Sequence, residues 1–273
     1  MLKYSLHDGN TLPPVGLGVW QASNKEVESA VDCAFGHGYR LIDTASIYEN
    51  EAGVGHALKN SGLPREAFYI TTKLWNTDQM RVQQALEESL TKLQLDHVDL
   101  YLIHWPAPSQ GQFIDAWKGL LAAKEQGLVK SVGVSNFQPE HIQRLQQETG
   151  ITPVVNQIEL HPLLSQPELV DWCQRENIAV QAWSPLAQGG ADVFNSKTVS
   201  TLSRGYGKTP AQIVLRWHLQ RNVCVIPKSV TPERIRENID IYDFSLSKQD
   251  MKAMDALNEN RRLGPHPDTF VNV

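Results

Sequence analysis

The feature that most constrains the fold of this chain is a regular alternation of short apolar runs with segments of helical periodicity. Each run is rich in Val, Ile and Leu and is followed by a loop and then by an amphipathic stretch. This order is typical of a parallel sheet covered by helices. The runs predict eight strands, at Val15–Gly18, Arg40–Asp43, Phe68–Lys73, Leu100–His104, Ser131–Val134, Val154–Ile158, Ala179–Trp183 and Val223–Pro227.

The length of the chain favours a closed barrel over an open doubly wound sheet. Eight strand-helix units fit within its 273 residues, with no break in composition and no Ser- or Gly-rich linker. We therefore predict an α/β fold in which residues 1–273 form one domain, a (β/α)8 TIM barrel.

Three further segments fall outside this repeat. Asp8-Gly9, between Lys3–Leu6 and Thr11–Pro14, predicts an N-terminal β-hairpin with a two-residue turn. Lys197–Tyr206 and Ser247–Leu257 have helical periodicity but no strand of their own. We expect them to form two extra helices outside the barrel.

Two helix starts are marked by a threonine followed by a proline, at Thr209-Pro210 and Thr231-Pro232. A threonine hydroxyl can accept from a free backbone N–H of the first turn, and proline in that turn loses no hydrogen bond. We expect both threonines to cap their helices.

Charge and hydropathy exclude several classes of partner. The net charge of −5 and the lack of any Lys/Arg-rich run leave no basic face for nucleic acid. No stretch reaches the roughly 20 apolar residues of a membrane span, and Met1–Asn10 does not have the pattern of a secretory signal. We expect a cytoplasmic protein that binds neither nucleic acid nor membrane, with a monomer as the default state.

Polar side chains stand at the C-terminal ends of consecutive predicted strands. Asp43, Lys73 and His104 end the second, third and fourth strands, and active sites of such barrels lie at these ends. A single Asp or Lys there is more often a cap or a solvated loop residue, but three together predict a functional rim. The later strand ends add hydrogen-bonding groups and one flat aromatic, namely Ser135, Asn136, Asn156, Gln157, Glu159, Trp183, Ser184, Lys228 and Ser229.

Motifs along essentially the whole chain resemble those of the aldo-keto reductase family. Asp43-Thr44-Ala45-Ser46-Ile47-Tyr48-Glu49-Asn50-Glu51 is similar to the family signature, and Gly16-Leu17-Gly18 precedes it. Ser184–Gly190 and Arg262-Leu263-Gly264-Pro265 are most similar to bacterial 2,5-diketo-D-gluconate reductases. Other blocks follow in family order: Thr72–Trp75, Leu102–Pro106, Gly133–Phe137, Asn156–Glu159 and Ile226–Ser229.

The resemblance implies an NADPH-dependent carbonyl reductase with a catalytic tetrad of Asp43, Tyr48, Lys73 and His104. Hydride delivery builds negative charge on the carbonyl oxygen, so Tyr48 would act as the general acid. An ammonium at ~4 Å in a dielectric of about 20 contributes about 4 kcal/mol. Lys73 would thereby lower the pKa of Tyr48 toward working pH, Asp43 would hold Lys73 charged, and neutral His104 would donate to the carbonyl oxygen.

No Rossmann fingerprint is present, because the third glycine position after Gly16 and Gly18 is Gln21. The resemblance instead implies that polar groups at two strand ends hold the nicotinamide carboxamide and that Trp183 stacks on the ring, although core packing is an equal alternative for Trp183. The carboxamide residues are Ser135, Asn136 and Gln157, and the loop expected to pass over the pyrophosphate contributes Ser184, Leu186, Gln188 and Gly190.

A phosphate site is predicted where the last strand leads into a helix, at Ile226–Arg234. Free N–H groups at a helix start and the positive end of its dipole favour anions. Lys228, Ser229, Val230 and Arg234 would surround the 2′-phosphate of NADP. Glu237 and Asn238, one turn on, are candidates to contact adenine, with a solvated helix face as the alternative.

The substrate side is expected to be walled by Trp20, Trp75 and Trp105, which follow strands that carry or neighbour the tetrad. The loop Pro106–Gly111 and the tail after Arg261 are short, which predicts an open pocket for small polar carbonyls. Diketo acids such as 2,5-diketo-D-gluconate, α-keto esters, methylglyoxal and simple aldehydes all fit this expectation.

Two other functions compete with catalysis by the tetrad. A non-catalytic NADP-binding regulatory subunit could share the fold, although the intact tetrad argues against it. A metal-dependent barrel hydrolase would want a His-x-His on an early strand, and the chain has none. We therefore expect no metal.

Overall fold

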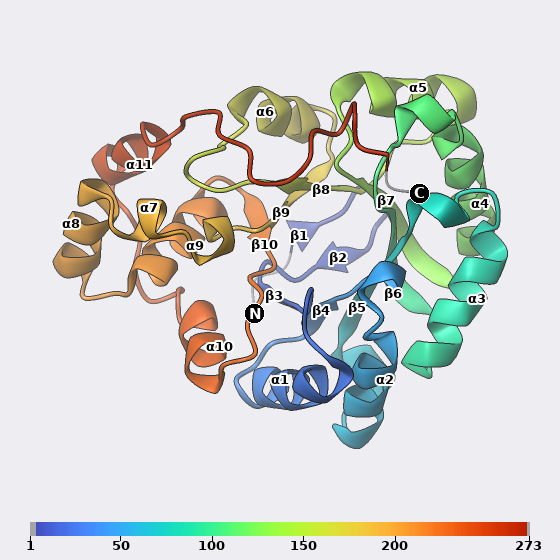
Figure 1. Cartoon of the computed structure of the whole chain (residues 1–273), viewed down its shortest axis with the longest axis horizontal. Coiled ribbons are helices and arrows are strands. Elements are labelled where there is room, and N and C mark those ends of the chain that lie inside the picture. Colours follow the sequence, from blue (N-terminus) through green and yellow to red (C-terminus); the bar gives the residue numbers. More distant parts are fainter. Residues whose placement is uncertain (1–3, 272–273) are drawn as a thin grey trace.

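The strands form a closed ring in the computed structural model, which describes residues 4–271. Strands β3 to β10 are parallel and pair in chain order (Figure 1). Parallel bridges between Val15 and Val225 and between Gly18 and Lys228 close the ring, and the Gly18 N–H donates to the Pro227 carbonyl at 3.2 Å. The bounds are β3 Gly16–Gly18, β4 Leu41–Asp43, β5 Tyr69–Leu74, β6 Val98–Ile103, β7 Val129–Ser135, β8 Val155–Glu159, β9 Ala179–Trp183 and β10 Val223–Val225.

A helix follows each strand and packs outside it, which confirms the (β/α)8 barrel. These helices are α1 Asn24–Gly36, α2 Glu51–Asn60, α3 Val82–Leu93, α4 Phe113–Glu125, α5 Pro139–Thr149, α6 Pro167–Arg175, α9 Pro210–Gln220 and α10 Pro232–Ile239. Short 3-10 turns lie at Ser46–Tyr48, Arg65–Ala67, Asn76–Asp78, Pro108–Gln110 and Ala187–Gly189.

The two extra helices are present as α8, Lys197–Tyr206, and α11, Lys248–Asp255. In Figure 1 both lie to one side of the barrel, beyond α9. A third helix, α7 at Ala191–Phe194, was not predicted. It is too short to display a helical period, and it directly follows Gly189-Gly190, a dipeptide that is typical of turns.

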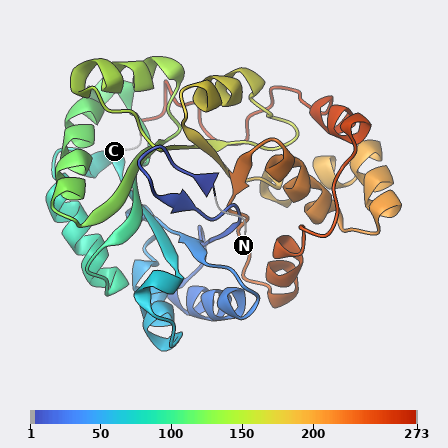
Figure 2. The same cartoon turned by 180° about the vertical axis from the view of Figure 1, so that it is seen from behind.

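The N-terminal hairpin closes the barrel at the end opposite the strand C-termini, as Figure 2 shows. Its strands are β1, Tyr4–Ser5, and β2, Thr11–Leu12. The predicted two-residue turn is wrong: the Leu6 N–H donates to the Asn10 carbonyl at 2.8 Å, so three residues form the loop. Gly9 takes a φ of +87° there, which glycine adopts without strain. Lys3 lies outside the described residues.

The apolar core has two parts. The larger fills the space between the strands and the surrounding helices. The smaller fills the barrel floor, where Leu6 and Leu12 of the hairpin pack on inward-facing side chains such as Leu41 and Leu100. This floor leaves the opposite end of the barrel as the open end.

The two threonine caps differ. The Thr209 hydroxyl accepts from the Gln212 N–H at 3.3 Å, which confirms that cap. Thr231 makes no capping bond, so that prediction is wrong. Its own N–H instead donates to the Ser229 hydroxyl at 3.1 Å. The first-turn N–H groups of α10 are therefore left without a side-chain acceptor from Thr231.

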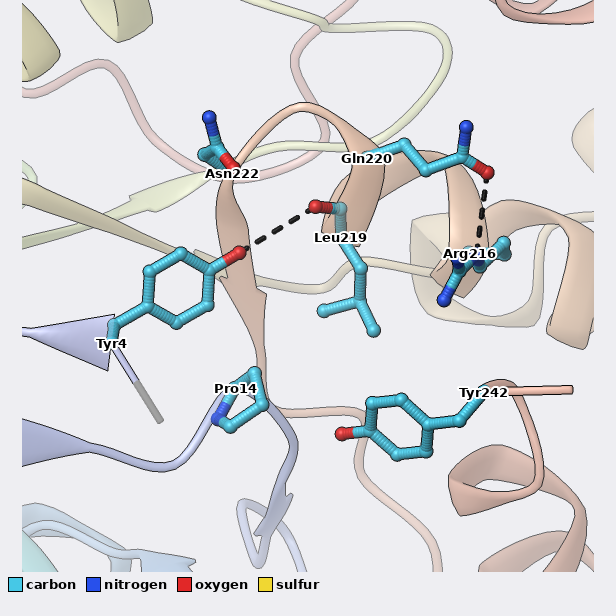
Figure 3. A pocket seen from close by; sticks show the side chains of 7 residues that line it. All are labelled: Tyr4, Pro14, Arg216, Leu219, Gln220, Asn222 and Tyr242. Carbon is cyan, nitrogen blue, oxygen red and sulfur yellow. Dashed lines mark hydrogen bonds between the residues drawn. The ribbon is translucent and has the colours of Figure 1, made fainter. Parts of the chain in front are cut away.

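A cavity of about 240 Å³ lies at the floor end of the barrel (Figure 3). Its lining includes Tyr4 of the hairpin, Pro14 just before β3 and Asn222 just before β10. Pro14 and Asn222 precede barrel strands and Tyr4 belongs to the floor hairpin, so the cavity is separate from the strand C-termini. Among residues 4–271, no helix combines the length and the apolar character needed to cross a membrane.

Candidate active site

A buried ion pair between Lys73 and Asp43 forms the base of the site. Lys73 lies on β5 and Asp43 ends the neighbouring strand β4. The Lys73 Nζ donates to Asp43 Oδ1 at 2.5 Å and to the Thr44 carbonyl at 2.8 Å. The two charged side chains are 0% and 2% exposed. Burial of charges at this depth is tolerated only when they are paired and hydrogen-bonded.

Lys73 is held in its charged form by its neighbours. Burial by itself lowers the pKa of an amine, but the Asp43 carboxylate and then Tyr48 outweigh it and raise the pKa of Lys73 above its ordinary value. The amine is therefore an ammonium at any working pH.

Gln157, on β8, supports this pair from across the barrel. Its Nε2 donates to Asp43 Oδ2 at 2.7 Å and to Gln181 Oε1 at 2.7 Å. Because both N–H groups are used inside the barrel, its Oε1 is the atom that remains to meet a carboxamide. Gln157 thus contacts the tetrad as well as lying among the predicted cofactor residues.

Tyr48 lies on the 3-10 turn Ser46–Tyr48 directly after β4. The Ser46 hydroxyl donates to the Lys73 carbonyl at 3.1 Å and ties this turn to β5. The Tyr48 ring is half-buried, and the Lys73 Nζ lies 5.0 Å from its centre. Tyrosine and ammonium therefore come together as predicted.

The predicted direction of the Tyr48 pKa is wrong. Burial raises the pKa of Tyr48 above its ordinary value, and the nearby charge of Lys73 lowers it only in part, with Asp43 adding to the rise. In this structure the phenol is thus fully protonated, and Lys73 limits the rise rather than reversing it.

His104 follows β6 and faces both Tyr48 and Trp75. Its ring centre lies 5.7 Å from that of Tyr48 and 5.0 Å from that of Trp75, both edge-on. The Asn136 Nδ2 donates to the backbone carbonyl of His104 at 3.0 Å. Burial, and then the Lys73 ammonium, holds the pKa of His104 well below its ordinary value. The imidazole is neutral, as expected for a hydrogen-bond donor to a carbonyl oxygen.

Asn136 and Trp183 extend the site along β7 and β9. Asn136 has a φ of +63°, a left-handed conformation that turns its amide toward the barrel. The Trp183 Nε1 donates to Asn136 Oδ1 at 2.8 Å, and the Ser135 hydroxyl donates to the Gln157 carbonyl at 2.8 Å. The half-buried ring of Trp183 is thereby fixed beside Asn136, and it also packs against the smaller apolar cluster inside the barrel.

The loop after β9 has a strained backbone. Ser184, Ala187 and Gln188 have φ angles of 47°, 51° and 57°. Non-glycine residues in this region cost free energy and cluster at ligand-binding segments. Ser184, Leu186 and Gly190 are half-buried and Gln188 is exposed, so this loop has the accessibility that a phosphate-covering segment needs.

The start of α10 fits an anion. Lys228 and Arg234 are exposed, and neither forms an ion pair with any residue between 4 and 271. The first-turn N–H groups lack a Thr231 cap, and the two cations lie in or just before that turn, an arrangement that favours an anion. Around them, Ser229 and Asn238 are buried, and Val230 and Glu237 are half-buried. This donor set suits the phosphates of NADPH.

The predicted aromatic wall forms only in part. Trp75 and Trp105 lie near the tetrad, and the Trp105 ring centre is 6.4 Å from that of Trp183. Trp20 is 45% exposed and contacts none of these rings within the described part of the chain.

Phe270, in the C-terminal tail, was missed by the sequence analysis. Its ring centre lies 4.5 Å from that of Trp105 and 6.3 Å from that of Trp75. The tail thus returns across the barrel to the substrate side, where Phe270 lies against two of the predicted wall residues. A lone Phe near the end of a chain carries no local signal of such a contact.

Known proteins are similar to this chain over nearly its whole length. The model of the Aldo/keto reductase family matches residues 14–259. Methylglyoxal reductase DkgA of Escherichia coli is 56% identical, with 97% of this chain and 96% of the relative covered. An aldo-keto reductase of Mycolicibacterium smegmatis is 49% identical over 98% of both chains. The solved structure of a Gox0644 variant in complex with NADPH has a TM-score of 0.94 and 43% identity, with 99% of each chain covered.

Proposed function

Because this chain belongs to the aldo/keto reductase family, we propose that Asp43, Tyr48, Lys73 and His104 are the residues with which it reduces carbonyl compounds. It is an NADPH-dependent oxidoreductase acting on small carbonyl substrates. The observation that supports the tetrad is the buried Lys73–Asp43 pair, at 2.5 Å, beneath a protonated Tyr48 and a neutral His104.

NADPH, when bound, supplies the hydride that reaches the carbonyl carbon. His104 donates a hydrogen bond to the carbonyl oxygen and orients it. Tyr48 gives its hydroxyl proton to that oxygen as negative charge develops there. An alkoxide is a much stronger base than a phenolate, so the transfer is favourable even from a phenol with a raised pKa. Lys73 stabilises the phenolate that remains, and Asp43 keeps Lys73 charged.

The residues proposed to bind the cofactor belong to three groups. Ser135, Asn136 and the Oε1 of Gln157 hold the carboxamide against the face of Trp183. The loop with Ser184, Leu186, Gln188 and Gly190 covers the pyrophosphate. The α10 group binds the 2′-phosphate through Lys228, Ser229, Val230 and Arg234, with Glu237 and Asn238 toward adenine.

For the substrate we propose small polar carbonyls, with methylglyoxal first, because a relative that is 56% identical over nearly its whole length bears that activity in its name. The reductases of 2,5-diketo-D-gluconate supply a second candidate through the sequence resemblance. Trp75 and Trp105 wall this side, together with Phe270; the exposed Trp20 would touch only a substrate that extends beyond these rings. We further propose that residues 1–273 form a single domain and a cytoplasmic monomer, which light scattering would test for its oligomeric state.

The experiment is NADPH oxidation against a panel of carbonyls that includes both candidates. Tyr48→Phe should bind NADPH as wild type does in a fluorescence titration but lose at least about 10²-fold in turnover. Tyr242→Phe, at the barrel floor, is the matched control and should keep full activity. Unchanged turnover in Tyr48→Phe would remove Tyr48 from the mechanism, and a flat wild-type panel with intact NADPH binding would favour the regulatory-subunit alternative.

A further inference from the structure

The C-terminal tail, residues 262–271, lies across the open end of the barrel. In Figure 1 it runs from α11 past α6 toward β7. The sequence alone gave no reason for this path, because the tail contains no strand or helix. A segment without its own backbone ladder needs other groups to fix it in place.

Glu159, at the end of β8, receives the first residues of the tail. Its Oε1 accepts from the Leu263 N–H at 2.6 Å and its Oε2 from the Gly264 N–H at 3.1 Å. The Arg262 guanidinium approaches Oε2 at 3.5 Å, and His161 Nε2 lies 2.9 Å from Oε1. The Glu159 side chain is 0% exposed.

The Glu159 carboxylate makes no hydrogen bond to a member of the proposed tetrad. Its partners are His161 and the tail residues 262–264. A buried carboxylate is costly unless its lone pairs are filled, and here most of the donors come from the tail itself. Although burial acts to raise the pKa of Glu159, the bonds from His161, Leu263 and Gly264 lower it below its ordinary value. The carboxylate is thus ionised, and its bonds to the tail are charge-assisted.

The tail fixed in this way touches the two sides of the proposed site. A Cβ at Gly264 would lie 2.5 Å from Trp183 Cη2 and 3.2 Å from Glu159 Oε2, so the backbone of the tail lies directly against the Trp183 ring. Further along, Phe270 packs on Trp105 at 4.5 Å. Two further ties are neutral or exposed: the Arg262 guanidinium donates to Gln166 Oε1 at 3.3 Å. The Asp268–His141 pair, at 3.6 Å, involves a carboxylate that is 52% exposed and contributes little.

We propose that Glu159 is a positioning residue for substrate binding: it anchors residues 262–264 and thereby places Phe270 as one wall of the carbonyl pocket. This inference rests on the proposed function of the tetrad. Glu159 touches no reacting atom, so its loss acts on substrate affinity and leaves the hydride and proton steps intact.

The first test is Glu159→Gln, which keeps the shape but replaces one acceptor with an N–H donor that faces the tail amides. Loss of a charge-assisted bond predicts a rise of about tenfold in KM for methylglyoxal, with kcat changed by less than about threefold. Glu168→Gln, an exposed carboxylate on α6, is the matched control and should change neither constant. A fall of about tenfold in kcat with KM unchanged would overturn the proposal.

A double-mutant cycle separates anchoring from a general structural effect. Deletion of residues 262–273 should raise KM at least as much as Glu159→Gln does. Adding Glu159→Gln to the shortened chain should then change kcat/KM no further, because the anchored segment is already absent. A full additive loss would show that Glu159 acts independently of the tail and would overturn the proposal.

The rate at which trypsin cleaves the tail can be measured without enzyme turnover. This test of anchoring is therefore independent of the proposed reaction. Arg261 and Arg262 are trypsin sites at the start of the tail, and the Arg262 side chain is only 18% exposed. Trypsin should remove the tail about tenfold faster in Glu159→Gln than in wild type or Glu168→Gln, as mass spectrometry would detect. Equal cleavage rates in all three proteins would refute the anchoring role, whatever the activity panel shows.

Discussion

Single buried titratable side chains determine both the chemistry and the acid stability of this barrel. Lys73 and Asp43 lie inside it as an ion pair, whereas His104 and His218 lie inside it as neutral rings. The difference is one of partners: the amine has a carboxylate at hydrogen-bond distance, whereas burial dominates for both imidazoles.

His218 predicts a loss of stability in acid. Burial in α9, opposed by its hydrogen bond to the Pro185 carbonyl, lowers the pKa of His218 to about 3. Below about pH 6.5 the unfolded chain binds a proton at His218 that the folded chain does not. The contribution of neutral His218 to the free energy of unfolding is therefore complete above this pH and decreases as the pH is lowered. We expect about 1.4 kcal/mol of unfolding free energy to be lost per pH unit between about 6.5 and 3.

Urea unfolding at a series of pH values measures this effect. His218→Gln should remove close to one proton from the slope of unfolding free energy against pH in that window. His56→Gln, whose side chain is 57% exposed on α2, is the control and should keep the wild-type slope. Parallel curves for all three proteins would show that His218 is not the group responsible.

At the level of residues, the sequence could predict which side chains come together at strand ends. It could not predict which side chains are brought together by contacts between distant parts of the chain. Asp43, Lys73 and His104 could be predicted to converge because parallel strands end at one rim. Glu159 was noted as polar, but its partner Leu263 is 104 residues away, so its role could not be predicted. The raised pKa of Tyr48 also depends on burial that no spacing reveals.

At the level of elements, all eight strands were found, and β9 and β10 begin where predicted, but the other six strand starts are shifted by one or two residues. We predicted that β6 begins at Leu100, yet the strand begins at Val98 and includes Asp99. Asp99 is buried within it because its carboxylate accepts from the Ile70 N–H at 2.8 Å, from Arg65 at 2.7 Å and from Lys130 at 2.8 Å. A charge satisfied from neighbouring elements does not end a strand.

The two threonine caps offer a matched pair of substitutions. Thr209→Ala removes a side-chain bond to the first turn of α9 and should lower the unfolding free energy by about 1 kcal/mol. Thr231→Ala removes no capping bond from α10 and should cost clearly less. Denaturant midpoints of the two variants measure this difference, and an equal loss would contradict the cap assignment.

The α10 start predicts cofactor preference. Replacing both Lys228 and Arg234 with Ala should weaken NADPH binding by about 10²-fold while NADH binding changes little, because two charge-assisted contacts to the 2′-phosphate are lost. Arg236→Ala is the control, since two positions along a helix turn its side chain by about 200° from Arg234. Calorimetric titration with both cofactors distinguishes the cases, and equal weakening of both would reject this role.

For the whole molecule, ring closure depends on a glycine at the seam between the first and last strands. A Cβ at Gly18 would lie 2.8 Å from the Ile226 carbonyl oxygen, so Gly18→Ala must separate β3 from β10. We expect a loss of about 1–3 kcal/mol in unfolding free energy. Gly36→Ala, at the exposed end of α1 with open space around it, should instead add about 0.5–1 kcal/mol. Thermal denaturation of both variants measures these opposite signs.

The closed ring itself could be predicted from eight strand-helix units, whereas the covering of its open end could not. Barrel closure follows from local patterns repeated along the chain. The path of residues 262–271 depends on a buried carboxylate and on two aromatic faces that come together only after the barrel has formed.

The seam has one more consequence, because Lys228 is bridged to Gly18 there. A cofactor held by Lys228 would bind at the junction where the beginning and the end of the barrel meet. Saturation with NADPH would then do more than fill a pocket: it would slow the opening of that junction. Backbone amides at Gly18 and Val225 should exchange their hydrogens with deuterated water more slowly in the loaded enzyme, while those of the distant hairpin should not.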